Sequence, residues 1–160
     1  MFRTKSKKGI ACLLAVVITA LMLPISVFAA EYDQGIDVTA DDYTDREGYT
    51  WDSATNTLTL TNVTLTGEGT GKGILLPQGE VTIVLEGENI IQGFAEGLAQ
   101  KSSSSTKGNS LEIKGSGSLT VSQCNYMSSG SFEDVTVDGA KLVGDNINGL
   151  VMNGNFVAKN

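Results

Sequence analysis

The chain is poor in the residues on which most catalytic and disulfide chemistry depends. Its 160 residues include no histidine, two cysteines, two prolines and one tryptophan. Without histidine the chain cannot form a serine–histidine triad, and it lacks a common ligand of transition metals. Cys124 is the only cysteine beyond residue 12. Because it has no imidazole neighbour, we expect it to be a buried, inert thiol.

Basic residues are also scarce, and their distribution is uneven. The chain has 11 basic and 18 acidic residues, and four of the basic ones lie within the first eight positions. All 18 acidic residues lie beyond residue 30, where only seven basic residues remain, so that part carries a net charge of −11. Nucleic acids and anionic lipids need a basic surface. We therefore expect no nucleic-acid partner and no membrane partner for this part of the chain.

Residues 1–29 have the pattern of a secretory signal peptide. A basic start precedes a mostly apolar run from Ile10 to Phe28, which Pro24 interrupts. The end of the run fits a small-residue cleavage site, with the cut after Ala29 or, alternatively, after Ala30. An uncleaved membrane anchor is the other reading, and the Pro24 break favours cleavage. We expect a bacterial protein that is secreted or displayed at the cell surface, with no intrachain disulfide.

An apolar, alternating motif returns along the rest of the chain at a nearly constant spacing. Its copies centre on Leu60, Ile83, Ile113 and Val137, which are 23, 30 and 24 residues apart. The longer middle step contains a polar insert at 100–110. Alternation of apolar and polar residues over short runs predicts half-buried strands, and a period of this length predicts stacked repeats. One further strand is expected near residues 36–38, and a turn at 51–56.

Two further series keep the same period. A second set of strands is predicted at 73–77, 97–100, 125–128 and 149–152. Turn residues that accept a positive φ recur just after the main strand. They are Asn62, Gly87, Gly115 and Gly139. We predict an all-β chain, a right-handed parallel β-helix of about four to five coils over residues 52–160, with residues 30–51 as a short N-terminal cap segment.

Four segments of the chain also resemble a known group of proteins. They are residues 49–60, 73–77, 84–90 and 113–121. They are similar to secreted and surface proteins of clostridia-type bacteria that carry a parallel β-helix labelled as a carbohydrate-binding domain, and the resemblance covers about residues 45–155. A characterised branch of that group resembles polysaccharide lyases in shape, binds plant cell-wall polysaccharide and holds calcium. The resemblance therefore implies glycan binding.

The residues needed for polysaccharide cleavage are sparse. A lyase on this scaffold needs a basic residue near the sugar α-proton and calcium held by carboxylates on one face. Arg46 is the only arginine beyond the signal segment, and Lys114 and Lys141 lie near predicted turns. A hydrolase needs paired carboxylates, whereas the acids on predicted strands are isolated. We expect no catalysis, with a pectate-lyase-like or hydrolase remnant as an alternative.

Aromatic side chains are the candidate sugar-binding residues, because rings stack on the apolar faces of sugars. Tyr43, Tyr49 and Trp51 lie within nine positions of one another, and Tyr126 lies in the second set of strands. For Trp51 we favour a role in plugging the open end of the coil. Tyr43 and Tyr49 are the better candidates for exposed rings, and Tyr126 is expected to be packed.

The densest group of carboxylates is Asp41, Asp42 and Asp45. Calcium binds six to eight oxygen atoms, several of them from carboxylates, so calcium is the candidate cofactor here. The spacing lacks the pattern of a calcium-binding loop, and a solvated acidic loop is the competing interpretation.

The sequence thus predicts a secreted, non-catalytic β-helix that recognises extracellular polysaccharide, with calcium as a candidate aid to binding. A structural or adhesin module that binds protein partners is the second hypothesis. End-to-end association of copies is a further candidate interaction, because a solenoid without a cap leaves unpaired strand edges.

Overall fold

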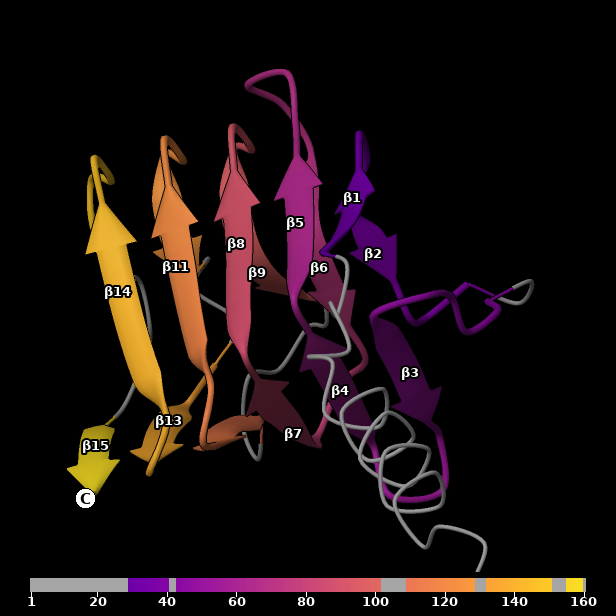
Figure 1. Cartoon of the computed structure of the whole chain (residues 1–160). Helices are drawn as coiled ribbons and strands as arrows, with labels where there is room; N and C mark the ends of the chain where they lie inside the picture. Colours follow the sequence, from indigo (N-terminus) through magenta and orange to yellow (C-terminus); the bar gives the residue numbers. More distant parts are fainter. Residues whose placement is uncertain (1–28, 41–42, 102–108, 129–131, 151–154, 160) are drawn as a thin grey trace, which may run out of the picture.

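Figure 1 shows the computed structural model of the chain, which describes residues 29–40, 43–101, 109–128, 132–150 and 155–159. Regular structure in these ranges consists of β-strands. The signal peptide predicted at 1–29 lies outside them except for its last residue. The strands are β1 (Ala30–Tyr32), β2 (Ile36–Asp37), β3 (Tyr49–Asp52), β4 (Thr57–Thr61), β5 (Val63–Thr66), β6 (Lys72–Leu76), β7 (Glu80–Glu86), β8 (Glu88–Gln92), β9 (Glu96–Gln100), β10 (Ser110–Gly115), β11 (Ser118–Ser122), β12 (Tyr126–Ser128), β13 (Asp134–Asp138), β14 (Lys141–Asp145) and β15 (Phe156–Lys159).

The strands are distributed over three sheets in rotation. Sheet 1 has the order β1-β5-β8-β11-β14, sheet 2 the order β15-β13-β10-β7-β4-β3, and sheet 3 the order β12-β9-β6-β2. From β4 onward the chain passes through sheets 2, 1 and 3 and then returns to sheet 2, where the new strand pairs in parallel with the earlier one. Strands β5, β8, β11 and β14 stand side by side across the front of Figure 1. The prediction of an all-β chain with stacked parallel strands is confirmed.

Each repeat, predicted to hold two strands, holds three in the structure. Each apolar run that reads as one strand in the sequence is split by a bend into a strand of sheet 2 and a strand of sheet 1. The residues predicted to accept a positive φ mark these bends, with φ of 54° at Asn62, 65° at Gly87, 111° at Gly115 and 70° at Gly139. A side chain at Gly87 would also collide with the Asn62 amide. The recurrent turn was therefore predicted correctly, but its effect on the strands was not.

The core is a column of aliphatic side chains inside the three sheets. Ile83, Ile113 and Val137 are in register on β7, β10 and β13, and all three are buried. Leu58, rather than the predicted Leu60, occupies this level on β4, and Leu60 pairs with Leu85 one level further on. Both leucines face inward, so a slip of two residues preserves the alternation and the sequence pattern cannot detect it.

Strand β8 shows a second difference from the predicted pattern. The apolar pattern of the sequence predicts that Ile90 faces the core, but Asn89 and Ile91 do so, each with 1% of its surface exposed. The Asn89 side chain accepts a hydrogen bond from the backbone N–H of Val63 (3.0 Å) and donates to the carbonyl oxygens of Glu86 (3.1 Å) and Ser118 (3.2 Å). One buried amide thus links three successive repeats, and these hydrogen bonds compensate for its removal from water.

The N-terminal cap segment closes one end of the stack. Strands β1 and β2 pair in parallel with β5 and β6, whereas β3 returns antiparallel to β4. The strand expected near residues 36–38 is β2. The turn predicted at 51–56 is shorter, because Trp51 and Asp52 belong to β3 and the turn occupies residues 53–56.

The opposite end of the stack is less covered by the described residues. Strands β14 and β15 are the last members of sheets 1 and 2, and Leu150 forms a single bridge with Ser128 on sheet 3. Of the fourth strand predicted in the second set, at 149–152, residues 151 and 152 lie outside the described residues. Leu150, Phe156 and Val157 are exposed. This end therefore presents apolar side chains and two strand edges that no described strand covers.

Candidate functional site

The structure brings together the predicted aromatic residues of the cap, but it turns one of them inward. Tyr49 is only 7% exposed and belongs to the core, so its prediction as an exposed ring is wrong. Its ring meets that of Tyr32 edge-on at 5.4 Å and lies 6.3 Å from that of Tyr43. The guanidinium carbon of Arg46 lies 5.9 Å from the centre of the Tyr32 ring. These contacts build an aromatic cluster that covers the end of the stacked sheets rather than a flat platform for sugars.

Tyr43 is half-buried at the rim of a small pocket of about 260 Å³ that Arg46 and Ile36 also line. Its hydroxyl is buried without a hydrogen-bond partner of good geometry among the described residues. Burial raises the pKa of Tyr43 well above its usual range, and the negative charge of the nearby Asp45 adds to this effect. The phenol is therefore neutral at physiological pH. Its ring packs against the core and so supports the cap.

Trp51 and Asp45 act together in the cap. The Trp51 side chain is half-buried and packs against the core, in agreement with its predicted role as cover. Its backbone N–H donates a hydrogen bond of 2.8 Å to the Asp45 carboxylate. Asp45, one of the predicted calcium ligands, therefore helps to hold the cap together. Asp41 and Asp42 lie outside the described residues, within which no group of three or more acidic or cysteine side chains is arranged to hold a metal. Calcium binding by these three residues stays a prediction.

Tyr126 was expected to be packed and is instead exposed, with 42% of its surface accessible. It lies on β12 in register with Glu96 and Lys72 of the two preceding coils, which form an ion pair of 3.9 Å. The ring stands apart from the cap aromatics on a different sheet. The four predicted sugar-binding aromatics therefore do not form one surface.

Cys124 is buried, as expected. Its thiol donates a hydrogen bond of 3.3 Å to the carbonyl oxygen of Ser122, and burial raises its pKa. Both effects favour the protonated thiol over the reactive thiolate.

A further recess among the described residues lies elsewhere, on the outer face of sheet 2. An open groove of about 640 Å³ runs from the turn before β4, across the start of β7, to β10. This volume is within the range of small-molecule sites. Most of the groove-lining residues carry hydroxyl, amide or carboxylate groups. They are Ala54, Thr55, Asn56, Glu80, Val81, Thr82, Ser110 and Glu112.

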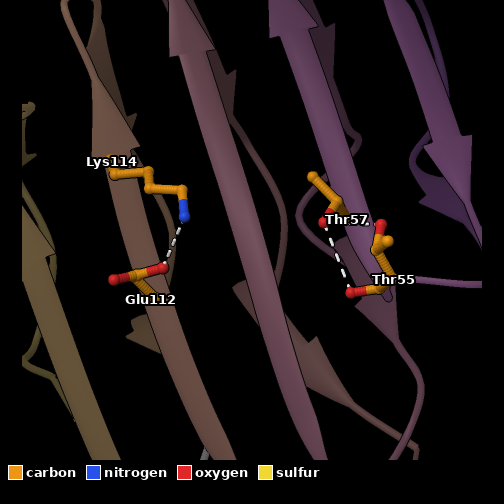
Figure 2. A network of polar contacts seen from close by, with 4 residues as sticks. All are labelled: Thr55, Thr57, Glu112 and Lys114. Atoms are coloured by element: carbon orange, nitrogen blue, oxygen red, sulfur yellow. Dashed lines mark hydrogen bonds and ion pairs between the residues drawn. The ribbon is translucent and has the colours of Figure 1, made fainter.

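The first wall of the groove is a tightly hydrogen-bonded turn. Asp52 accepts hydrogen bonds from the backbone N–H of Ala54 (2.9 Å) and from the Thr55 hydroxyl (2.8 Å). These two donors hold the pKa of Asp52 below its usual value, with the hydroxyl having the larger effect. The Thr55 hydroxyl oxygen also lies 3.0 Å from the hydroxyl oxygen of Thr57 (Figure 2). Local side-chain bonds of this kind fix the turn and so position the hydroxyls of this wall.

The opposite wall carries an ion pair. The Lys114 ammonium group donates a 2.8 Å hydrogen bond to one carboxylate oxygen of Glu112, on the same strand (Figure 2). This contact is the main cause that holds the pKa of Glu112 below its usual value. Between the walls, Thr82 is in register with Glu112, and Glu80 with Ser110.

Sequence reasoning missed this groove, although its residues are visible in the sequence. Glu80 and Thr82, like Ser110 and Glu112, occupy alternate outward positions of predicted strands. The predicted alignment of Ile83 with Ile113 already places the two pairs side by side. The wall formed by residues 54–56 depends in addition on the register of β4 against β7, which the alternating pattern does not reveal. The groove holds hydroxyl donors and carboxylate acceptors suited to a hydroxyl-rich ligand.

No helix in the described ranges is long and apolar enough to cross a membrane. Comparison with known proteins finds no family model, no curated protein and no solved structure that matches this chain.

Proposed function

We propose that the protein is a secreted, non-catalytic, glycan-binding module built as a right-handed parallel β-helix. The rotation of the strands through three sheets supports a coil, since each strand stacks in parallel on the equivalent strand of the preceding coil. The right hand is supported by general stereochemistry, because crossovers between parallel strands of one sheet are right-handed in about 98% of cases. Secretion is supported by the signal-peptide pattern of residues 1–29.

The groove on sheet 2 is the observation that carries the glycan-binding proposal. Its walls offer the hydroxyls of Thr55, Thr82 and Ser110 together with the carboxylates of Glu80 and Glu112. Sugars are recognised through many such hydrogen bonds, each of which must replace a bond to water. The groove is open and crosses neighbouring coils, which suits a chain of sugar units.

A binding experiment with two matched variants tests this proposal. The secreted chain is titrated with soluble polysaccharides with and without calcium. Its mass is measured first, to check that residues 1–29 have been removed. We expect Thr82→Val to weaken binding by about tenfold, since one hydrogen bond contributes roughly 0.5–1.5 kcal/mol and 1.4 kcal/mol is a factor of ten. Thr120→Val removes a hydroxyl from the outer face of sheet 1 and should leave binding unchanged. Failure of the unaltered chain to bind any plant or bacterial polysaccharide would reject the proposal.

A structural or adhesin role is the second candidate function. It is favoured by the uncovered edges of β14 and β15 and by the exposed Leu150, Phe156 and Val157 beside them. Strand edges with apolar side chains are ready templates for pairing with another chain. The two roles are compatible, because this end and the groove involve different residues.

A further inference from the structure

The groove on sheet 2 has an unbalanced charge. Two of the groove-lining residues are acidic, and none is basic. The Glu80 side chain is exposed at the start of β7 and makes no hydrogen bond or ion pair with any described residue. Glu112 is paired through one oxygen atom with Lys114, which lies at the margin of the groove. Among the described residues, the site therefore offers a bound ligand one carboxylate without a partner and a second whose charge is partly compensated.

The neutral groups of the groove define the rest of the ligand. The hydroxyls of Thr55 and Thr82, which are hydrogen-bonded to Asp52 and Glu112, can accept bonds from sugar hydroxyls. The Ser110 hydroxyl and the Asn56 amide can both donate and accept. A neutral glycan would leave the Glu80 carboxylate partly desolvated without a partner, which is unfavourable. An acidic glycan would bring like charges together. A ligand with both hydroxyls and positive charge satisfies all the groups of the groove.

From this combination we infer that the groove binds glycans with free amino groups, such as oligomers of deacetylated amino sugars. A protonated sugar amine pairs with the Glu80 carboxylate, while the neighbouring hydroxyls bind Thr82 and Ser110. This inference rests on the proposed glycan-binding function and specifies its ligand class. A lysine-rich peptide would match the charge but would leave the hydroxyl-lined walls without sugar hydroxyls to bind.

Lys114 has a defined part in this site. Its ammonium group donates a 2.8 Å hydrogen bond to the Glu112 carboxylate. It thus takes the position that a second amine of the ligand would otherwise take. Removal of Lys114 therefore makes the groove more negative without removing any groove-lining residue. A variant that gains affinity in this way is informative, because damage to the fold would lower affinity instead.

The experiment compares four soluble oligomers of equal length by calorimetric titration. They are oligomers of glucosamine, of N-acetylglucosamine, of glucose and of galacturonic acid, at low salt and at a pH where the amine is protonated. We expect the glucosamine oligomer to bind at least about tenfold more tightly than the glucose oligomer, the advantage of one charge-assisted hydrogen bond. N-acetylation should abolish this advantage, and the galacturonic acid oligomer should bind most weakly.

Three variants locate the effect. Glu80→Gln should weaken binding of the glucosamine oligomer by about tenfold and leave the glucose oligomer unaffected. Lys114→Gln should tighten binding of the glucosamine oligomer by about threefold, the size expected for an exposed ion pair. Glu88→Gln is the matched control, since it removes the same charge from an exposed position on sheet 1. It should behave like the unaltered chain.

Each contrary result has a separate meaning. Equal affinity for the glucose and glucosamine oligomers, or no effect of Glu80→Gln, would overturn the amino-sugar inference while glycan binding stands. A lysine peptide that binds as tightly as the glucosamine oligomer would also overturn it, because attraction of any polycation would then suffice. Absence of binding by all four oligomers and by longer polysaccharides would reject the proposed function itself.

Discussion

At the scale of single residues, buried polar groups determine how adjacent repeats pack together. Asn89 is the clearest example, because its side-chain amide forms hydrogen bonds with three backbone groups from three parts of the chain. An aliphatic residue at this position would match the alternation of the strand but would leave those groups without a partner. The inward position of an asparagine in β8 thus follows from the backbone groups around it, which an apolar pattern does not record.

Replacement of Asn89 by alanine should lower the free energy of unfolding by about 2–3 kcal/mol, the upper part of the cost of leaving buried polar groups unsatisfied. Urea denaturation of the chain without residues 1–29 measures this change. Gln92→Ala provides the control, since Gln92 lies on the same strand and its side chain donates one exposed hydrogen bond, to the Thr66 hydroxyl. We expect a cost below about 0.5 kcal/mol there, as for surface substitutions in general. Equal costs at both positions would refute the bridging role of Asn89.

Tyr43 makes stability sensitive to alkaline pH. Burial raises its pKa above the ordinary phenol value of 10.0, so the folded chain holds this proton more tightly than the unfolded chain. By linkage, the contribution of Tyr43 is fully present below the unfolded pKa and is lost as the pH rises above it. Tyr43→Phe should therefore flatten the decline in stability above about pH 10, with little change at neutral pH. An unchanged decline in pH-dependent urea denaturation would contradict this account.

At the scale of strands, the sequence predicted the repeat better than its details. The residues of positive φ at Asn62, Gly87 and Gly115 were found because few residue types tolerate that conformation. The register of β4 against β7 was not found, because Leu58 and Leu60 are equivalent in an alternating pattern. The groove on sheet 2 depends on that register, so it too was beyond reach.

The candidate aromatic site shows the same limit at the level of side chains. Tyr43, Tyr49 and Trp51 are close together in the sequence, and this correctly suggested that they would lie near one end of the stack. Whether a ring faces the core or the solvent depends on the antiparallel return of β3, which brings Tyr49 opposite Leu60. Tyr126 is the opposite case, a ring expected to be packed that is exposed. Its isolated position in the sequence gave no sign of this exposure.

At the scale of the whole molecule, the two ends of the stack differ. The cap covers one end with Tyr32, Tyr49 and Trp51, whereas the edges of β14 and β15 have no described strand beyond them. Val157 is 41% exposed on the last strand of sheet 2. A second copy that pairs with this edge would remove it from water and satisfy the unpaired backbone groups.

We therefore expect concentration-dependent association, detectable by sedimentation analysis, that Val157→Lys abolishes. A lysine on a strand edge opposes pairing because its charge would have to be buried in the new contact. Val84→Lys is the control, since Val84 lies on β7, which is flanked on both sides by β4 and β10 in the same sheet. A chain that sediments as a monomer at all concentrations would refute self-association through this edge.

The long step between β9 and β10 also has a practical consequence. The N–H of Lys101 donates to the carbonyl oxygen of Leu76 (2.8 Å), and that of Ser110 donates to the carbonyl oxygen of Gly79 (3.2 Å). The preceding coil thus secures the chain on both sides of the intervening residues, and β10 resumes its pairing with β7. Foreign peptides inserted between these two anchors should accordingly leave the strands on either side in alignment.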